Sequence, residues 1–248
     1  LVIIAHTVKG KGVSEMEDKI EWHYRNIPED VYQRALEELE LYGKYGLSGA
    51  IVENYHADKR TVEKVLKETA KLDTIAIGVN ILPNQFDRAF TLAEKYNAQF
   101  IQMDYVAGIY HNHGAEPDHK VDLKKYQLLK QQFPEIVVLG GVWPKYYYPV
   151  EDANIDDDIL EGKRRAEALV VTGHGTGKEI PTDKIQRFRS TAGDHPIIVG
   201  ADSTPDNLAQ QLAIADGAIV GSYFKKGNTK LPIDEGRLRE YMEEVKRL

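Results

Sequence analysis

The sequence predicts a single closed (β/α)8 barrel, and three observations support that prediction. The length of 248 residues is the usual length of one such barrel. Eight short apolar runs rich in β-branched residues alternate with amphipathic stretches. The runs are continuously apolar, which suits strands of a parallel sheet that is covered on both faces. Eight alternations favour a closed barrel over an open doubly wound sheet, which would also carry a glycine-rich turn directly after its first strand.

The predicted elements follow one another in a regular order. The eight predicted strands are residues 1–5, 49–52, 75–79, 100–103, 136–139, 168–171, 196–199 and 218–220. Helix-like stretches between them include residues 29–45, 59–72, 85–96, 123–132, 205–213 and 234–247. No stretch resembles an interdomain linker. Residues 1–248 are therefore predicted to form one domain, with residues 1–45 as the first βα unit and residues 46–248 as units two to eight.

Composition restricts the classes of function. A hydrophobic fraction of 42% and a charged fraction of 29% are typical of globular proteins, and the formal net charge of -7 argues against a general nucleic-acid binder. No Cys is present, which excludes disulfides and thiolate chemistry and favours the cytoplasm. No apolar run approaches the ~20 residues that span a bilayer, so membrane insertion is not expected. The start at Leu1 lacks the basic region of a signal peptide and suggests a fragment or an engineered product.

Two neighbouring predicted strands end in glycine, and this is the clearest functional signal. Gly200-Ala201 and Gly221-Ser222 follow the seventh and eighth strands, and the loops at these two places recur as the phosphate site of such barrels. A glycine there lets backbone N–H groups approach an anion closely, and a following helix N-terminus adds its positive end. We therefore predict that these four residues bind phosphate. The alternative is that the glycines only permit tight turns.

A second glycine-rich loop follows the sixth strand. Thr172, Gly173 and Gly175 are predicted to contact a ligand, and His174 is a candidate general acid or base because its ordinary pKa is ~6.5. A solvent-facing loop histidine is an equally good interpretation of His174. The loop does not match the P-loop pattern, because Gly-Lys is followed here by Glu179.

Carboxylates end two other predicted strands. Glu53 and Asp104 are expected to point into the barrel mouth, where paired carboxylates move protons or hold a metal ion. Either carboxylate could instead hydrogen-bond Asn54, Asn80 or Lys145, and the last two are also predicted to bind the ligand. Asp202, in the loop after the seventh strand, is the fourth candidate for acid–base catalysis.

No metal site or cofactor is predicted. His111, His113 and His119 lie in the loop after the fourth strand, but their spacing matches no zinc pattern and a polar lid is the better interpretation. The acidic run at residues 151–158 is interpreted as a solvated loop and helix start.

From about residue 46 to the end, the sequence resembles the BtpA/SgcQ family of the ribulose-phosphate-binding barrel group. The motifs that carry the resemblance are AIVEN at 50–54, GVNIL at 78–82, ALVVTGHGTG at 168–177 and the Gly200 and Gly221 loops. Members of that family are associated with photosystem I biogenesis and with sugar-utilisation gene clusters. The chain departs from the family in lacking its opening strand motif and in reading GGVWPK at 140–145.

Residues 1 to about 40 resemble a different protein. VIIAHTVKGKGVS at 2–14 and EWHYR at 21–25 are similar to the end of the thiamine-binding half of split transketolases. Residues matching the cofactor's diphosphate and metal motifs are missing, so transketolase chemistry is not expected. The segment would supply the first βα unit, which suggests a chimera made by design or by gene fusion.

These observations lead to one preferred function and two alternatives. The preferred function is a phosphate-binding barrel that binds or converts a phosphorylated sugar or nucleotide-like molecule, and as an enzyme it would be a lyase or isomerase. The first alternative is a non-catalytic assembly factor of the photosystem I biogenesis type, and the second is a fusion barrel without selected activity. The expected partner is a small phosphorylated ligand or inorganic phosphate, and a homo-oligomer is compatible with the sequence.

Overall fold

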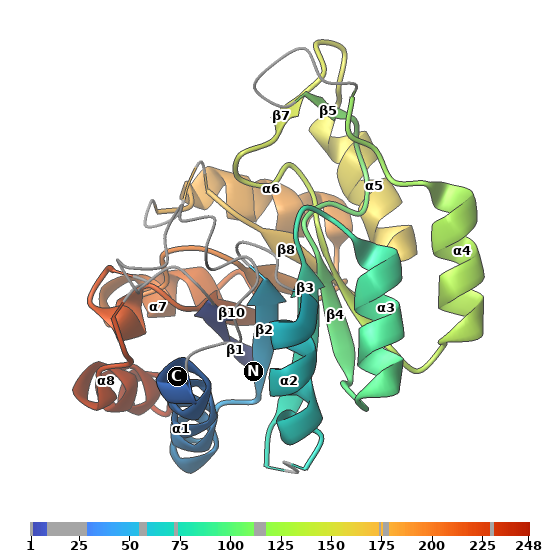
Figure 1. The fold of residues 1–248 in the computed structure, drawn as a ribbon. Helices are drawn as coiled ribbons and strands as arrows, with labels where there is room; N and C mark the ends of the chain where they lie inside the picture. The colour runs from blue at the N-terminus through green and yellow to red at the C-terminus, as the bar shows by residue number, and fades with distance from the viewer. Residues whose placement is uncertain are drawn as a thin grey trace.

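A computed structural model of the chain describes residues 2–8, 29–54, 59–71, 74–111, 118–173, 175, 179–228 and 231–248. Eight strands close into a barrel in the order β1-β10-β9-β8-β6-β4-β3-β2, with helices around the outside (Figure 1). The predicted (β/α)8 barrel is therefore confirmed.

Each predicted strand overlaps one strand of the barrel. The barrel strands are β1 Val2–Val8, β2 Gly49–Asn54, β3 Ala76–Ile81, β4 Phe100–Met103, β6 Val137–Gly141, β8 Ala168–Val171, β9 Ile197–Val199 and β10 Gly217–Val220. Closure depends on β1, which pairs in parallel with β2 and with β10, so that Ala5 lies between Ala50 and Val220. Without this pairing the other seven strands would form an open sheet with two unpaired edges.

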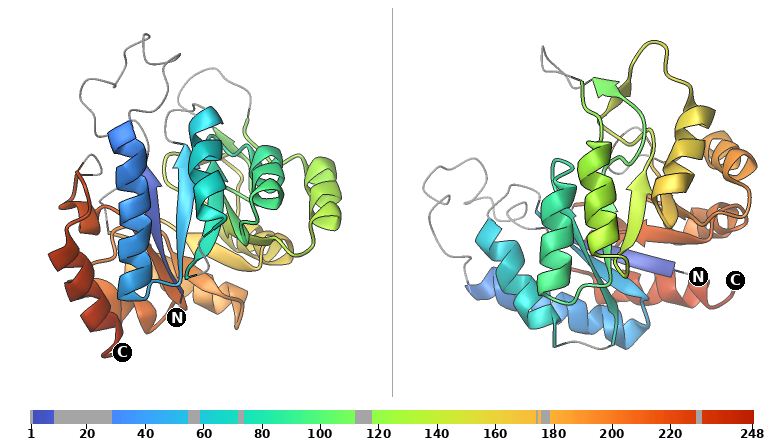
Figure 2. Two further views of the ribbon diagram at one scale, coloured as in Figure 1. Left: turned by 60° about the horizontal axis from the view of Figure 1, so that its bottom comes forward. Right: turned by 90° about the vertical axis from the view of Figure 1, so that its right-hand side faces the viewer.

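Helices follow the strands and cover the outside of the barrel (Figure 2). They are α1 Glu29–Tyr45, α2 Lys59–Thr69, α3 Phe86–Lys95, α4 Leu123–Gln132, α5 Ile155–Arg165, α6 Thr182–Ala192, α7 Pro205–Leu212 and α8 Glu235–Val245, with a short 3-10 helix η2 at Tyr223–Lys225. The acidic run at residues 151–158 does lead into a helix. The Asn154 side chain caps α5 by accepting from the Asp156 N–H at 3.0 Å, and acidic residues occupy its first turn, where the helix dipole favours negative charge.

A small antiparallel pair, β5 Tyr110–His111 with β7 Tyr148–Pro149, lies outside the barrel and was not predicted. Figure 1 shows it at the end of the molecule away from the chain termini. It ties the loop after β4 to the loop after β6. The two loops are therefore held together beyond the strand ends.

The barrel interior is filled by inward-pointing side chains of alternate residues. Its buried cluster is Ile51, Phe100, Leu139, Ala168, Val170, Ile198 and Ile219. The Phe100 ring occupies the space where Gly78 has no side chain, since a Cβ at residue 78 would lie 2.0 Å from a ring carbon. The residues between these positions pack outward against the helices in a second, larger cluster.

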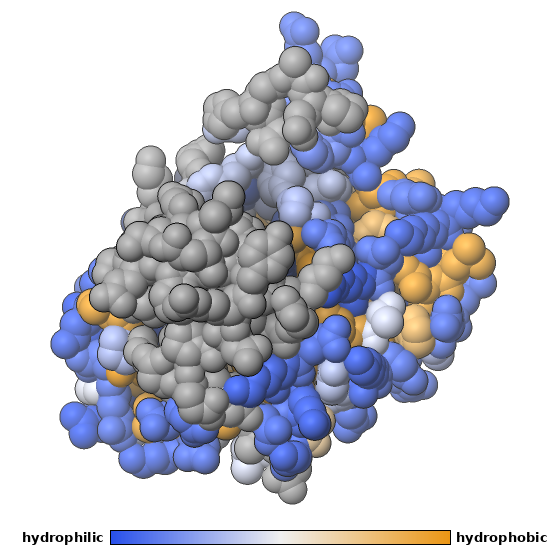
Figure 3. Space-filling view, in the orientation of Figure 1, coloured by the Kyte–Doolittle hydropathy of each residue, from blue (hydrophilic) through white to orange (hydrophobic). Residues whose placement is uncertain are grey.

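Among the coloured residues on the face in Figure 3, hydrophilic ones predominate, and hydrophobic residues gather over the region of α4. Leu123 and Leu128 of that helix are 40% and 60% exposed. Within the described ranges, no helix is both long enough and apolar enough to cross a membrane.

Candidate functional site at the barrel mouth

Strand alternation places a ring of residues at the carboxyl ends of the barrel strands. Inward-pointing Ile51, Gly78 and Phe100 are followed two residues later by Glu53 on β2, Asn80 on β3 and Gln102 on β4. The strand registers place these last three residues side by side. By the same alternation, the far side of the ring consists of Thr172, Gly200 and Gly221, which follow β8, β9 and β10. One side of the mouth is therefore polar, and the other is largely without side chains.

Two carboxyl groups meet on the polar side. Asn80 Nδ2 donates to Glu53 Oε1 at 3.3 Å and to Asp104 Oδ1 at 3.5 Å. Asp104 Oδ2 accepts from the Asn84 N–H and from the Tyr147 hydroxyl, each at 3.1 Å. Both carboxylates thus hydrogen-bond Asn80, which is the structural alternative considered for them, and their proposed role in acid–base chemistry stays a prediction.

Burial, and after it the nearby charge of Glu53, raise the pKa of Asp104, whose net value is about 6 against an ordinary value of 3.8. The hydrogen bonds from Tyr147, Asn84 and Asn80 favour the charged carboxylate and oppose part of this increase. Asp104 is thus poised to exchange a proton near neutral pH.

Gly141 makes room for Asp104. A Cβ at residue 141, on β6, would lie 1.9 Å from the Asp104 carbonyl oxygen. The backbone N–H of Val106 donates to the Gly141 carbonyl at 2.9 Å, which fixes the start of the loop after β4 against β6. Any larger residue at 141 would displace the carboxylate that ends β4.

An aromatic cluster holds the Tyr147 side chain in place. Its ring lies 5.1 Å from Tyr105, 6.0 Å from Tyr110 and 5.9 Å from His119, all edge-on. Tyr105 and Tyr110 are buried, so these rings are part of the packed rim. This packing directs the Tyr147 hydroxyl to Asp104, whereas the neighbouring Tyr146 and Tyr148 are about half exposed.

A half-buried lysine that was not among the predicted site residues joins two mouth loops. Lys184 Nζ, from the first turn of α6, donates to the carbonyl oxygens of Trp143 and Thr172 at 2.9 and 2.8 Å. Desolvation lowers the pKa of Lys184 to about 8. The Lys145 N–H donates to Thr172 Oγ1 at 2.8 Å, so the loop after β6 rests on the end of β8.

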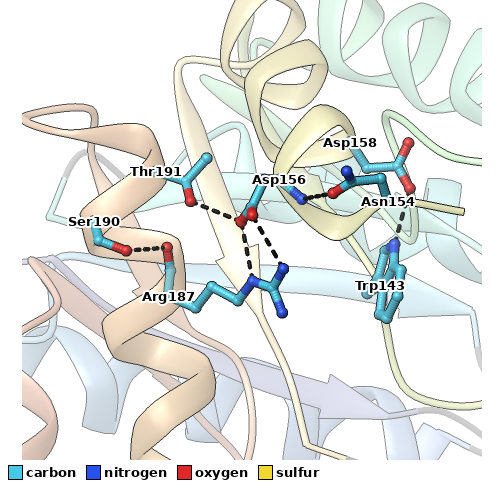
Figure 4. Close-up of polar contacts among 7 residues, drawn as sticks. All are labelled: Trp143, Asn154, Asp156, Asp158, Arg187, Ser190 and Thr191. Atoms are coloured by element: carbon cyan, nitrogen blue, oxygen red, sulfur yellow. Dashed lines mark hydrogen bonds and ion pairs between the residues drawn. The ribbon is translucent and has the colours of Figure 1, made fainter.

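The loop after β6 is also fastened to the outer helices (Figure 4). Trp143 Nε1 donates to Asp158 Oδ2 of α5 at 2.8 Å, and the Arg187 guanidinium of α6 donates two hydrogen bonds to Asp156 at 3.0 Å each. Thr191 adds a third hydrogen bond to Asp156 at 2.9 Å. These contacts give Trp143 a structural partner on α5.

Backbone N–H groups are the available donors in the loops after β9 and β10. In the described part of the chain, the N–H groups of Ala201, Ser222 and Tyr223 donate to no backbone or side-chain acceptor. Tyr223 begins η2, so the last two stand at the N-terminal end of a short 3-10 helix directly after β10. A short extra helix beside the loops after strands seven and eight is the usual anion site of this fold.

Tyr241 of α8 holds the loops after β9 and β10 together through one hydrogen bond and one ring contact. The Ser203 and Tyr241 hydroxyls lie 2.6 Å apart and are buried, which links the loop after β9 to α8. The Tyr241 ring also meets Phe224 of η2 edge-on at 5.5 Å. Tyr241 therefore touches both glycine-ended loops.

A buried ion pair joins η2 to α1. Lys225 Nζ, at the end of η2, donates to both Glu38 oxygens at 3.0 and 3.1 Å, and each side chain is 7% exposed or less. Glu38 belongs to α1, and Tyr42 of the same helix packs against Phe224 at 6.3 Å. The position of η2 is thus set jointly by α1 and α8.

The remaining predicted residues lie in several places. Asp202 has a left-handed backbone with φ 49°, and its carbonyl accepts from Asn207 Nδ2 at 2.9 Å at the start of α7. Gly173 and Gly175 are buried next to Thr172. His174 lies outside the described residues, as does His113, so their predicted roles are untested. No group of three or more His, Asp or Glu that could hold a metal ion occurs within the described residues.

The fold and the mouth define a (β/α)8 barrel of the class that binds small molecules at the carboxyl ends of its strands. The sequence model of the BtpA family matches residues 20–247, and the chain belongs to that family.

Relatives in several organisms span nearly the whole chain. A protein of Methanocaldococcus jannaschii is 29% identical over 238 residues, which cover 87% of each chain. The photosystem I biogenesis protein BtpA of Synechocystis is 24% identical over 86% of this chain and 79% of its own length.

Solved structures share the fold at low sequence identity. Phosphoribosyl anthranilate isomerase of Thermus thermophilus has a TM-score of 0.62 and 13% identity, covering 100% of this chain and 99% of its own. The (S)-3-O-geranylgeranylglyceryl phosphate synthase of Thermoplasma acidophilum was solved with sn-glycerol-1-phosphate. It has a TM-score of 0.62 and 15% identity, and the match covers 100% of this chain and 94% of the synthase. These likenesses concern the barrel fold.

The family match extends further toward the N-terminus than predicted. It begins at residue 20 and includes α1, whereas the sequence motifs suggested a start near residue 46. The similarity of residues 1 to about 40 to a split transketolase stays a prediction. His23 and most of that segment lie outside the described residues.

Proposed function

We propose that the chain is a phosphate-binding barrel that holds a small phosphorylated ligand across its mouth. The phosphate would lie between the loops after β9 and β10, at Gly200, Ala201, Gly221 and Ser222. The observation that carries this proposal is that the N–H groups of Ala201, Ser222 and Tyr223, beside the start of η2, have no acceptor among the described residues. Solved barrels whose names include phosphorylated molecules share the fold, which supports the proposal further.

Acid–base chemistry is proposed for the opposite side of the mouth. A pKa of about 6 suits Asp104 to exchange a proton at neutral pH, with Glu53 as its charged neighbour. His174 and Asp202 are proposed as further acid–base groups, and Asn80, Lys145, Thr172, Gly173 and Gly175 as ligand contacts. The reaction class that fits a carboxyl pair acting on a sugar phosphate is an isomerisation or a lyase reaction. We propose no bound metal ion or cofactor.

A second candidate function is a non-catalytic role in assembly, in which the same phosphate site senses a metabolite. The observation that favours it is the similarity to the photosystem I biogenesis protein BtpA. In both cases we propose that residues 1–248 work as one barrel domain in the cytoplasm.

Replacing Gly221 with valine tests the phosphate site. Gly221 lies at the strand end and is only partly buried, so a branched side chain there should occlude the anion position with limited loss of stability. Isothermal titration of inorganic phosphate should show binding to the parent and none to Gly221→Val. Equal binding by both proteins would refute the assignment, provided circular dichroism shows both to be folded.

A further inference from the structure

The orientation of the Asn80 amide is determined by its neighbours. Its Nδ2 faces two carboxyl groups, those of Glu53 and Asp104, at 3.3 and 3.5 Å. A reversed amide would place its oxygen against both acceptors, so the nitrogen must face them. Asn80 Oδ1 consequently points elsewhere, and it has no hydrogen-bond partner among the residues that the structure describes, although the side chain is only 2% exposed.

A second acceptor of the same kind lies beside it. Gln102 Oε1 is buried and has no hydrogen-bond partner within the described residues. Gln102 follows Phe100 by two residues on β4, so it points into the barrel one layer closer to the mouth. The register that sets Val79 beside Ile101 places Asn80 next to Gln102. Two unpaired amide oxygens therefore occur on adjacent strands.

Most donors in this part of the mouth are paired within the described residues, whereas the Gln102 amide offers both an oxygen and a nitrogen without a partner there. The Asn80 amide N–H groups, the Asn84 N–H and the Tyr147 hydroxyl are already directed at carboxylates. Buried polar groups in proteins are nearly always paired, so two unpaired oxygens at the carboxyl ends of the barrel strands, where this fold places its sites, indicate partners that a ligand supplies. A ligand hydroxyl group fits this site, because it can donate to the Asn80 oxygen and either donate to or accept from the Gln102 amide. A ligand carboxylate would instead meet two carboxyl groups and two amide oxygens.

We propose that Asn80 and Gln102 form a hydroxyl-recognition subsite, so that the ligand is a phosphate ester bearing free hydroxyl groups, a polyol or sugar phosphate. The proposal rests on the proposed phosphate site across the mouth, because the phosphate would fix the ligand while its hydroxyl groups reach β3 and β4. Gln102 acts here as a specificity-determining residue. A simple alkyl phosphate would leave both oxygens unpaired.

A matched pair of ligands tests this subsite. Glycerol phosphate and propyl phosphate have the same carbon chain and differ by two hydroxyl groups. A hydrogen bond to an otherwise unpaired buried acceptor changes affinity by about tenfold, so isothermal titration should show glycerol phosphate binding at least about tenfold more tightly. Gln102→Met keeps the side-chain size and loses no hydrogen bond within the protein. It should lower that ratio about tenfold and leave the affinity for propyl phosphate unchanged.

Two controls separate specificity from folding. Gln131→Met makes the same replacement on exposed α4 and should keep the parent ratio. Gln102→Glu keeps an acceptor oxygen and should retain a preference for glycerol phosphate even if its added charge weakens both ligands.

The outcomes distinguish the two proposals. Equal affinities for the two ligands in the parent, or an unchanged ratio in Gln102→Met, would overturn the hydroxyl subsite while the phosphate site stands. Failure of the parent to bind inorganic phosphate, glycerol phosphate or propyl phosphate would overturn both.

Discussion

Replacing Asp104 with asparagine is expected to stabilise the protein at neutral pH. The structure explains why: the carboxyl group is buried beside Glu53, and its pKa is raised from 3.8 to about 6. Asparagine has nearly the same shape and can still accept from the Asn84 N–H and the Tyr147 hydroxyl through its own oxygen, and it loses only the long hydrogen bond of 3.5 Å from Asn80 Nδ2. The replacement removes the negative charge of the Asp104 carboxylate, which is costly to bury. A group placed for reaction is often unfavourable for stability in this way.

The size of the effect follows from the change in pKa. About two pKa units at 1.36 kcal/mol each correspond to about 3 kcal/mol, which is an upper value because the side chain keeps some contact with solvent. The folded protein holds the Asp104 proton more tightly than the unfolded chain. The free energy of unfolding of the parent therefore falls, by up to this amount, as pH rises from about 4 through about 6. The variant does not titrate there, so its advantage should be near zero at pH 4 and full above pH 7.

Urea unfolding of both proteins at several pH values measures this difference directly. At pH 7.5 the melting temperature of the variant should also rise, by roughly 5 to 10 °C. A variant that is less stable than the parent at pH 7.5, or an advantage that does not change with pH, would refute the assignment of a charged, buried Asp104.

Two further predictions concern the scaffold of the site. Gly78→Ala should destabilise the barrel by about 1 to 3 kcal/mol in urea unfolding, because its Cβ would lie 2.0 Å from the Phe100 ring; stability equal to the parent would contradict this packing. Lys225→Met should cost about 3 to 5 kcal/mol by leaving Glu38 buried without its partner, and adding Glu38→Leu should recover part of the loss. If Lys225→Met alone were neutral, the buried ion pair under η2 would not exist as described.

Much of the fold could be predicted because it depends on local pattern. The apolar runs at 100–103 and 168–171 coincide with β4 and β8, since buried parallel strands need continuous apolar residues. Glu53 and Asp104 were found because they end such runs, where the fold places its sites. The pair β5 and β7 was missed because two-residue strands leave no periodicity to detect.

The supporting residues of the site could not be predicted in the same way. Lys184 lies 41 residues from Trp143 and Tyr147 lies 43 from Asp104, so only the closed fold brings them together. Gln102 had a signal that was overlooked. It lies inside an apolar run, and strand alternation places it on the same side as Phe100.

The central claim is that an anion binds between the two glycine-ended loops. Titration of inorganic phosphate into isotope-labelled protein, followed by backbone amide NMR, tests it most directly because each N–H group reports its own contact. The largest saturable shifts should occur at residues 200–202 and 221–223, and they should vanish in Gly221→Val. Shifts that avoid both loops, or shifts there that persist unchanged in Gly221→Val, would contradict the account.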